Sequence, residues 1–309
     1  MSSTAFDLDG RVRIAAFEWL SKQTKLYGDV LQRNLLEAGF EYEDKFIPLV
    51  SPQGIFKPQV LPEIPLSITT TPSGPYDDSF GEDGLLRYRY RGTDPRHRDN
   101  EGLRLAMVRR TPLIYFHGIV PGKYLAVWPA FIVGDHPERL SFSVAADDGA
   151  YSQTDSPGRE GLLLADSAEV PRRAYITAAV KQRLHQRGFR ERVLLAYREQ
   201  CAFCLLRHAE LLDAAHIIAD SEPEGIPSVQ NGISLCKLHH AAFDSHFLGI
   251  RPDYIVVVRR AILDEEDGPM LLHGLKDMNN RRMVLPTRHD LEPDKSLLEM
   301  RFQEFKRVS

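Results

Sequence analysis

Two short metal-binding patterns constrain this chain more than any other feature of its sequence. Cys201 and Cys204 are separated by two residues, and so are Cys236 and His239. Each spacing places two ligands one tight turn apart, and a set of three cysteines and one histidine is typical of tetrahedral structural zinc. The pattern therefore predicts a Zn²⁺ site. The alternative is three buried, reduced cysteines beside an unrelated histidine.

The cysteine count and the composition limit the class of protein. Among 309 residues there are 3 cysteines, an odd number that argues against a disulfide-stapled secreted fold. Hydrophobic residues make up 43% and charged residues 27%, as in ordinary globular proteins with two or three domains at this length. No run of about 18 apolar residues is present, and the N-terminus lacks the apolar core of a secretory signal. We expect a cytoplasmic protein without membrane contact.

The net charge of −4 conceals two basic segments. Residues 86–110 contain eight arginines against three acidic residues, a net charge of +5, and residues 171–200 carry +6. The rest of the chain then carries −15. Two basic segments in an acidic chain favour local contacts with phosphate, although solvated arginine-rich faces would give the same count.

The front half of the chain predicts a helical part followed by strands. Within residues 1–61, the apolar spacing predicts two helices, the second starting at Val30, and then a hairpin, compatible with a winged-helix-like cap. Residues 62–150 are strand-like, and Pro121-Gly122 forms a turn between two β-rich runs. These residues predict a sheet or barrel.

The back half is separated from the front by the polar, turn-rich residues 151–170, which we interpret as a linker. Residues 171–309 form the predicted last domain. It begins with a helix over about 172–198, broken near Gly188, and ends with an amphipathic helix near 297–305. The predicted fold class is α+β.

Three further residues are interleaved with the two zinc pairs. His216 lies in an apolar, strand-like run, Asn231 in a polar loop, and His240 directly after the second pair. This His–Asn–His series between zinc ligands resembles the HNH nucleases of the ββα-metal class, over about residues 172–252. The resemblance implies a zinc-stabilised ββα-metal domain that hydrolyses phosphodiester bonds.

The resemblance also implies a role for each residue. His216 would be the general base that activates water, since a neutral imidazole suits that role near pH 7. Asn231 would hold a loop and orient the base. His240 would bind one Mg²⁺ or Mn²⁺ ion, distinct from the zinc, and Asp244 could join it from the same helix face.

One position departs from the family pattern. Many HNH nucleases have an acidic or histidine metal ligand directly before the base, where this chain has Ala215. Asp213 lies two residues earlier and, on a strand, faces the same side, so we expect it to replace that ligand. The departure also keeps open a zinc-containing DNA-binding protein whose catalysis has decayed.

A second resemblance lies in the strand-like region, over about residues 62–147. It is similar to SRA domains, PUA-like barrels that flip a modified cytosine out of DNA. The residues that carry the likeness are Tyr76-Asp77-Asp78, Tyr90-Arg91-Gly92, Asn100 with the apolar residues 103–106, and Gly122-Lys123-Tyr124.

The SRA likeness implies a DNA-reading surface. A flipped base needs an aromatic ring for stacking and a polar partner for its hydrogen-bonding edge. Tyr76 or Tyr90 would stack, and Asp78 or Asp77 would accept from the cytosine amine. Arg87, Arg89 and Arg91 would hold phosphates, and Asn100 belongs to the same surface. An ordinary β-barrel with surface arginines is the alternative.

The whole chain resembles modification-dependent, type IV restriction endonucleases with an SRA-like sensor and an HNH nuclease. This implies hydrolysis of double-stranded, base-modified DNA, and a homodimer would be needed to cut both strands. Two alternatives stay open. The front domain could sense a phosphorothioate or a nucleotide signal, or the chain could bind DNA without cutting it.

Overall fold

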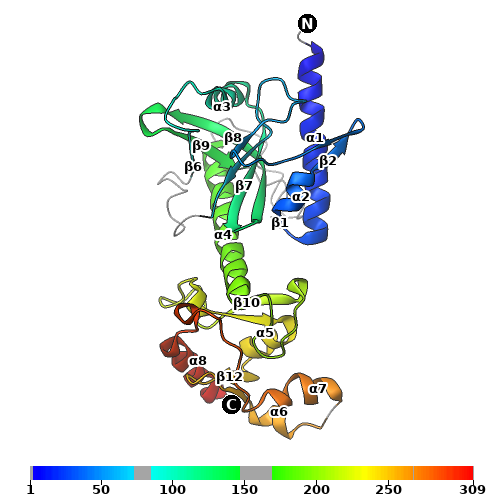
Figure 1. The fold of residues 1–309 in the computed structure, drawn as a ribbon. Helices are drawn as coiled ribbons and strands as arrows, with labels where there is room; N and C mark the ends of the chain where they lie inside the picture. The colour runs from blue at the N-terminus through cyan, green and yellow to red at the C-terminus, as the bar shows by residue number, and fades with distance from the viewer. Residues whose placement is uncertain (1–2, 73–84, 147–168, 267, 309) are drawn as a thin grey trace. The chain divides into compact units, whose positions relative to one another are not determined.

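The computed structural model describes residues 3–72, 85–146, 169–266 and 268–308. The chain divides into two compact units, a first unit, Met1–Leu184, and a second unit, His185–Ser309. Figure 1 colours the first unit from blue to green and the second from green to red. No helix in the described ranges is long and apolar enough to cross a bilayer.

The first unit is built on a seven-stranded sheet with helices packed against it. Its elements are α1 (Ser3–Tyr27), β1 (Val30–Gln32), α2 (Arg33–Ala38), β2 (Phe40–Tyr42), β3 (Lys45–Ile47), β4 (Ile55–Phe56), β5 (Ser67–Thr70), β6 (Leu86–Arg89), α3 (Arg98–Arg109), β7 (Leu113–Val120), β8 (Lys123–His136), the 3-10 helix η1 (Pro137–Arg139) and β9 (Ser141–Ala146). The helix α4 (Glu169–Ala196) begins in this unit and ends in the second.

The two longest strands have both faces buried. Ile114 and Phe116 of β7 lie in the core that contains residues of α1. Leu113 and Tyr115 lie in a second core, which contains residues of α3. Because successive side chains of a strand point to opposite faces, burial on both sides explains why β7 is apolar on both faces apart from His117. The predicted pair of strands joined by a turn at Pro121-Gly122 is confirmed.

The sheet of the first unit is open in the described part of the chain. Its strands lie in the order β4-β5-β7-β8-β9-β6, with β1 paired to β8. β5 and β7 are parallel, and the other pairs are antiparallel. Among the described residues no ladder joins β4 to β6, so this sheet is half of a barrel. The closed SRA/PUA-like barrel that the sequence predicts is not shown.

Two of the predicted helices differ from the structure. The second helix does not begin at Val30, because residues 30–32 form β1, whose Leu31 is fully buried and pairs with Tyr124 of β8. The hairpin predicted after it is confirmed as β2 and β3. The break expected near Gly188 is also wrong, since α4 continues through it. One helical glycine costs only about 1 kcal/mol, which buried neighbours such as Phe189 offset.

The second unit contains the zinc pairs and a short hairpin. Its elements after α4 are the 3-10 helix η5 (Ala209–Leu211), β10 (Leu212–His216), η6 (Val229–Asn231), β11 (Gly232–Cys236), α5 (Lys237–Asp244), β12 (Leu248–Ile250), β13 (Val256–Val258), α6 (Arg260–Asp264), α7 (Pro269–Gly274), η7 (Lys276–Met278), η8 (His289–Leu291) and α8 (Lys295–Val308).

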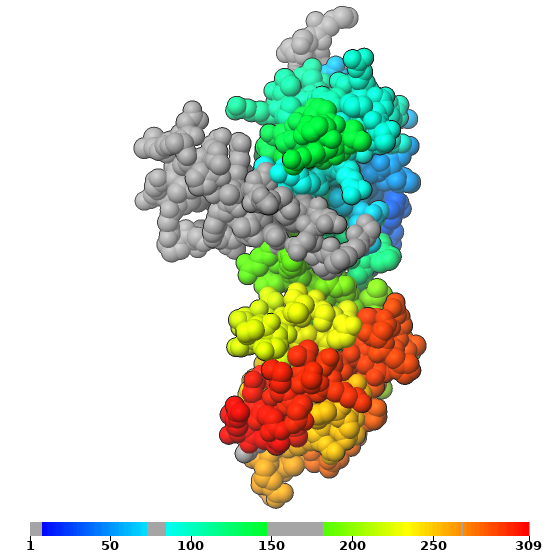
Figure 2. Space-filling model, turned by 90° about the vertical axis from the view of Figure 1, so that its left-hand side faces the viewer, coloured from blue at the N-terminus to red at the C-terminus, as the bar shows by residue number. Residues whose placement is uncertain are grey.

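One continuous hydrophobic core joins these elements. It runs from Phe189 and Val193 of α4 through the hairpin to Leu298 of α8. The predicted last helix is confirmed as α8, which packs against β12, where the ring of Phe305 lies over Gly249. Figure 2 shows the C-terminal residues, in red, on the surface of this unit.

Candidate metal centre and histidine site

A hairpin and a helix carry the predicted site residues of the second unit. β10 and β11 pair antiparallel, with Leu212 opposite Cys236 and His216 opposite Gly232. Cys236 ends β11 and directly precedes α5, which packs across both strands. The local fold is therefore β-β-α, and it places His216 at one end of the hairpin and the second zinc pair at the other.

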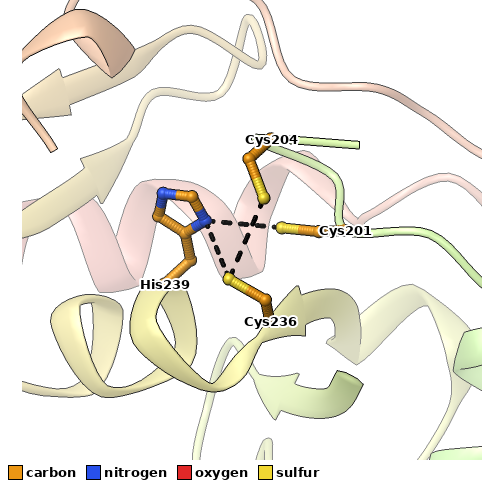
Figure 3. A group of neighbouring side chains, drawn as sticks. All are labelled: Cys201, Cys204, Cys236 and His239. Carbon is orange, nitrogen blue, oxygen red and sulfur yellow. Dashed lines mark hydrogen bonds between the residues drawn. The ribbon is translucent and has the colours of Figure 1, made fainter. Parts of the chain in front are cut away.

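Cys201, Cys204, Cys236 and His239 form one cluster, as the spacing predicts. Their ligand atoms all lie within 4.8 Å of one another. The Nδ1 atom of His239 is 3.2 Å from Sγ of Cys236 and 3.5 Å from Sγ of Cys201, and the four side chains converge in Figure 3. This Cys₃His cluster could bind zinc.

The surroundings prepare this cluster for a metal ion. The Nε2–H of His239 donates to the carbonyl oxygen of Gly274 at 2.7 Å, which leaves the Nδ1 lone pair facing the sulfur atoms. Hydrogen bonds from the thiols of Cys201 and Cys204 lower the pKa of Cys236 and favour its thiolate, while the pKa values of Cys201 and Cys204 are raised. A fixed histidine tautomer and a stabilised thiolate are what a structural zinc site requires.

His216 is held by an aromatic ring. Its imidazole stacks on Phe189 of α4, with ring centroids 3.9 Å apart and planes inclined by 15°. Gly232, opposite His216, makes room for this stack, since a Cβ atom there would lie 2.8 Å from Cζ of Phe189. The Nε2 atom of His216 is buried and has no hydrogen-bond partner among the described residues. None of these residues fixes the ring through that nitrogen.

Electrostatics keep His216 neutral near pH 7. Burial lowers its pKa, and the positive charge of His240 acts in the same direction. The negative charges that oppose this shift are, from strongest to weakest, those of Asp220, Asp244 and Asp213. Asp220 was not among the predicted site residues, although its position four residues after His216 was visible in the sequence. A neutral imidazole can accept a proton.

Asn231 is fully buried and holds the loop that follows His216. Its Oδ1 accepts from the backbone N–H of Ile218 at 2.9 Å, and its Nδ2 donates to the carbonyl oxygens of Ile218 and Ile226. The carbonyl oxygen of Asn231 also accepts from Ile217. The loop that Asn231 holds lies between β10 and β11.

His240 lies between the two carboxylates that were predicted with it. Its Nδ1 atom is 3.6 Å from Oδ2 of Asp213, and its Nε2 atom is 3.2 Å from Oδ2 of Asp244. Hydrogen bonds to Asp213 and Asp244 raise the pKa of His240 to about 9. The structure thus brings Asp213, His240 and Asp244 together. Ala215 is fully buried in the hydrophobic core and offers no ligand.

Arg190 of α4 lies beside Asp213, the β10 residue of the group formed by Asp213, His240 and Asp244. It donates to the carbonyl oxygens of Ala209 and Leu212 and pairs with Glu191, and its Nε atom is 3.6 Å from Oδ1 of Asp213. Although burial disfavours the charge of Asp213, its contact with His240 lowers the pKa of this carboxyl. The sequence interpretation gave the basic helix only a phosphate-binding role, so this contact was missed.

The residues predicted to read a base are only partly described. Tyr76, Asp77 and Asp78 lie outside the described residues. Tyr90 is 6% exposed, stacks against Phe142 and hydrogen-bonds to Asp135 through its hydroxyl. Its ring is part of a core in this structure.

The other predicted DNA-binding residues differ in exposure. Asn100 is fully buried, where its side chain binds backbone groups of Arg91 and Asp94. Arg91 pairs with Asp99 at 2.9 Å. Arg87 donates to Ser143, whereas Arg89 is exposed. Asn100 therefore holds the loop of residues 91–94, which contains Arg91, whereas Arg87 and Arg89 lie on β6.

Comparisons with known proteins give a family match within the second unit. Residues 201–251 match a family model described as HNH endonuclease. Among solved structures, the chain is similar to the modification dependent TagI restriction endonuclease, at 15% identity over 78% of this chain and 82% of that chain, with a TM-score of 0.27. It is also similar to the type IV phosphorothioation-dependent restriction endonuclease ScoMcrA, at 15% identity over 82% of this chain and 56% of that chain, with a TM-score of 0.24. No curated protein sequence matches it.

Proposed function

Starting from an HNH endonuclease domain at residues 201–251, we propose that this chain is a divalent-metal-dependent endonuclease that hydrolyses DNA phosphodiester bonds. One observation carries the proposal. The β10–β11–α5 unit holds a neutral, stacked histidine, His216, and a second histidine, His240, whose charge acts on His216 and which lies between two carboxylates. A base and an acidic metal-binding group on one ββα unit suit phosphodiester hydrolysis.

In this proposal His216 accepts the proton of the attacking water. Its lowered pKa keeps the imidazole unprotonated at pH 7, and its stack on Phe189 fixes the ring plane. Asn231 holds the backbone directly after the base and so limits its movement. Holding a base within hydrogen-bonding reach of water is worth about 100- to 10,000-fold in rate.

A hard divalent ion, Mg²⁺ or Mn²⁺, fits the acidic group around His240. His240 would hold it together with Asp244, Asp213 or both, because carboxylate and imidazole ligands with open positions suit such ions. When bound, the ion supplies positive charge for the phosphate and the leaving oxygen. The zinc proposed for the Cys₃His cluster is separate and structural.

The first unit would select the DNA. We infer an SRA-like sensor for modified cytosine, supported by the half-barrel and by the arginines around β6. Arg89 and Arg96 are exposed, and the side chain of Arg98, which lies 3.4 Å from a carboxylate oxygen of Asp99, is still 83% exposed, so all three can reach phosphates. Tyr76, Asp77 and Asp78 remain the proposed base-reading residues, together with Tyr90. Because Tyr90 is buried, a stacking role would require it to leave its core position.

Cleavage assays test the nuclease proposal. The wild-type protein is incubated with plasmid DNA and Mg²⁺ or Mn²⁺ beside the variants His216→Ala and His208→Ala. His208 is exposed and lies outside the site, so it is the matched control. We expect His216→Ala to lose about 100-fold or more of the rate and His208→Ala to cut normally. Equal cutting by His216→Ala and the wild type would refute the catalytic role.

The same assay separates the alternatives for the front unit. Substrates that are unmodified, carry 5-methylcytosine or 5-hydroxymethylcytosine, or contain phosphorothioate linkages are compared at equal concentration. Preference for a modified cytosine supports the SRA-like sensor, and preference for phosphorothioate DNA contradicts it. Tight DNA binding by the wild type without any cutting would instead favour the decayed, zinc-containing DNA-binding protein, which the buried Ala215 would then explain.

One such site cuts one strand, so we propose that a homodimer makes double-strand breaks. The conversion of nicked to linear plasmid should then rise more steeply than linearly with protein concentration. A linear dependence throughout would contradict the dimer.

The zinc proposal has its own measurement. We expect about one zinc ion per purified chain, lost in Cys201→Ser and retained in His208→Ala. Zinc removal by a chelator should also unfold the second unit, seen as a loss of circular dichroism, because such sites contribute folding free energy. Metal-free protein that is fully folded would refute the site.

A further inference from the structure

We propose that Asp213 is a positioning residue that orients His240, and that the catalytic ion is shared by His240 and Asp244 alone. The inference rests on the proposed nuclease function and deepens it. It also separates two carboxylates that the sequence treats as equivalent ligands.

The geometry of the imidazole ring carries the first step. Asp213 approaches Nδ1 of His240, at 3.6 Å, and Asp244 approaches Nε2, at 3.2 Å. A metal ion bound by a histidine lies on one ring nitrogen, while the other usually donates its N–H to a carboxylate or carbonyl. The two carboxylates therefore cannot both share an ion with His240 in this arrangement. One must be a ligand and the other must orient the ring.

The Asp213 side already has a cation. Nε of Arg190 lies 3.6 Å from Oδ1 of Asp213, and Arg190 is fixed there by the carbonyl oxygens of Ala209 and Leu212. The same Oδ1 accepts the backbone N–H of Ala214 at 2.9 Å. A divalent ion at this carboxylate would be repelled by a guanidinium that cannot lose its charge. Asp213 is thus suited to accept an N–H, not to bind an ion.

The Asp244 side is open. In the described part of the chain, no lysine or arginine lies within 4.0 Å of its carboxylate, whose ion-pair partner is His240. The side chain is 57% exposed, which leaves room for water and a phosphate oxygen. Asp244 also lies four residues after His240, on the same face of α5.

The position of His216 also favours an ion on the Asp244 side of His240. Asp213 lies three residues before His216 on β10, which is about 10 Å along a strand. α5 begins directly after Cys236, which lies opposite Leu212, and it contacts both strands of the hairpin. The charge of Asp244, its last residue, acts on His216 more strongly than the charge of Asp213 does. An ion at Nε2 of His240 is therefore better placed to meet a phosphate that is attacked by water from His216.

These contacts form a chain from Arg190 through Asp213 to His240. Arg190 lies beside Asp213, and Asp213 faces Nδ1 of His240 at 3.6 Å. With an ion on Nε2, the nitrogen that faces Asp244, the proton of His240 stays on Nδ1, the nitrogen that faces Asp213.

The test compares the same isosteric change on the two sides of one ring. Mn²⁺ binding to the zinc-loaded, DNA-free protein is measured by electron paramagnetic resonance for Asp213→Asn, Asp244→Asn and Asp253→Asn. Asp253 pairs with Arg251 outside the site and is the matched control. We expect Asp213→Asn to weaken binding by about 10- to 100-fold, as for other residues that orient a ligand. Asp244→Asn should lose measurable binding, and Asp253→Asn should bind normally.

A second measurement reads the tautomer directly. Long-range ¹H–¹⁵N correlation spectra of the Mg²⁺-saturated protein, assigned with His240→Gln, show which nitrogen of His240 carries the proton. We expect the proton on Nδ1 of His240, and a proton on Nε2 would overturn the inference. The inference would also be overturned if Asp213→Asn lost Mn²⁺ binding while Asp244→Asn retained it.

The arginine and the proposed function are tested separately. Arg190→Gln should weaken Mn²⁺ binding as Asp213→Asn does, and the double variant should lose no more, because both changes break one chain of contacts. Additive losses would contradict this chain of contacts from Arg190 to His240.

If Mn²⁺ binding and the tautomer are as expected but His216→Ala cuts DNA normally, the nuclease mechanism fails while the positioning role stands. If the wild type binds no Mn²⁺, both fail.

Discussion

His216 is the residue on which the proposed chemistry depends most directly. Its histidine identity and its place in an apolar strand were evident in the sequence. Its neutral state was not, because that depends on burial and on the partner ring of Phe189 in α4. The structure therefore explains why a histidine at this position can act as a base near pH 7.

The pH dependence of cleavage should report the lowered pKa of His216. A base must be unprotonated, so kcat/KM should rise with pH, with the midpoint of the rise below the ordinary histidine pKa of about 6.5. Asp220 raises this pKa, so Asp220→Asn should move the rising limb to still lower pH. The measurement is the pH profile of cleavage for both proteins. A rising limb that moves to higher pH in Asp220→Asn would contradict the assignment of this limb to His216.

Gly232 should be needed for the stack on His216. In Gly232→Ala the new Cβ would lie 2.4 Å from Cγ2 of Val193 and 2.8 Å from Cζ of Phe189, both in the core. Overpacking of this kind costs about 1–3 kcal/mol of unfolding free energy. Urea unfolding measures it, with Gly268→Ala as the control, since a Cβ at Gly268 meets no atom within 4 Å. Equal stability of the two variants would show that the core adapts.

Among the elements, α5 links the metal centre to the proposed catalytic ion. His239 and His240 are adjacent on this one helix, yet His239 joins the cysteines and His240 joins the carboxylates. Neighbouring residues of a helix point about 100° apart, so adjacent histidines serve different sites. The assignment of His239 and His240 to two different sites follows from helix geometry, and the sequence predicted both sites.

The helix α8 supports α5 from outside the segment that matches the HNH family model. Arg301 of α8 donates to the carbonyl oxygen of Phe243 at 3.3 Å, and its guanidinium lies 5.1 Å from the Phe243 ring centroid. It also reaches the carbonyl oxygen of Asp244. A cation at the last carbonyl groups of a helix stabilises that end.

Removing this support should loosen the end of α5. We expect Arg301→Ala to lower the unfolding free energy of the second unit by about 1–2 kcal/mol, and to weaken Mn²⁺ binding because Asp244 is the last residue of α5. Urea unfolding and Mn²⁺ titration test this. Arg307→Ala, an exposed change on the same helix, should have little effect. Equal effects of both changes would exclude a specific role for Arg301.

For the whole molecule, the segregation of charge matters more than its sum. The first basic segment contains exposed arginines around β6 and α3, but Arg91 and Arg104 are tied into ion pairs. In the second segment, Arg190 is fixed within the second unit. Counting charges along the sequence therefore overstates the number of arginines that remain available for phosphate.

The exposed arginines of the first unit should determine part of the salt dependence of DNA binding. Each phosphate contact contributes about 0.9 to the slope of log K against log salt concentration. Replacing Arg89, Arg96 and Arg98 together by glutamine should thus reduce the slope by up to about 2.7. Binding isotherms at several salt concentrations measure it, with Arg260→Gln, an exposed change in the second unit, as the control. An unchanged slope would place the DNA contacts elsewhere.

The sequence by itself determined the Cys₃His set, because each zinc pair lies within one turn, and its resemblance to HNH nucleases implied the ββα unit. Only the tertiary structure decided which nitrogen of His240 meets which carboxylate, that Arg190 lies beside Asp213, and that Tyr90 is buried against Phe142. The physical reason is separation along the chain. Local spacing fixes which residues can share an ion, whereas contacts between distant segments depend on how their helices and strands pack.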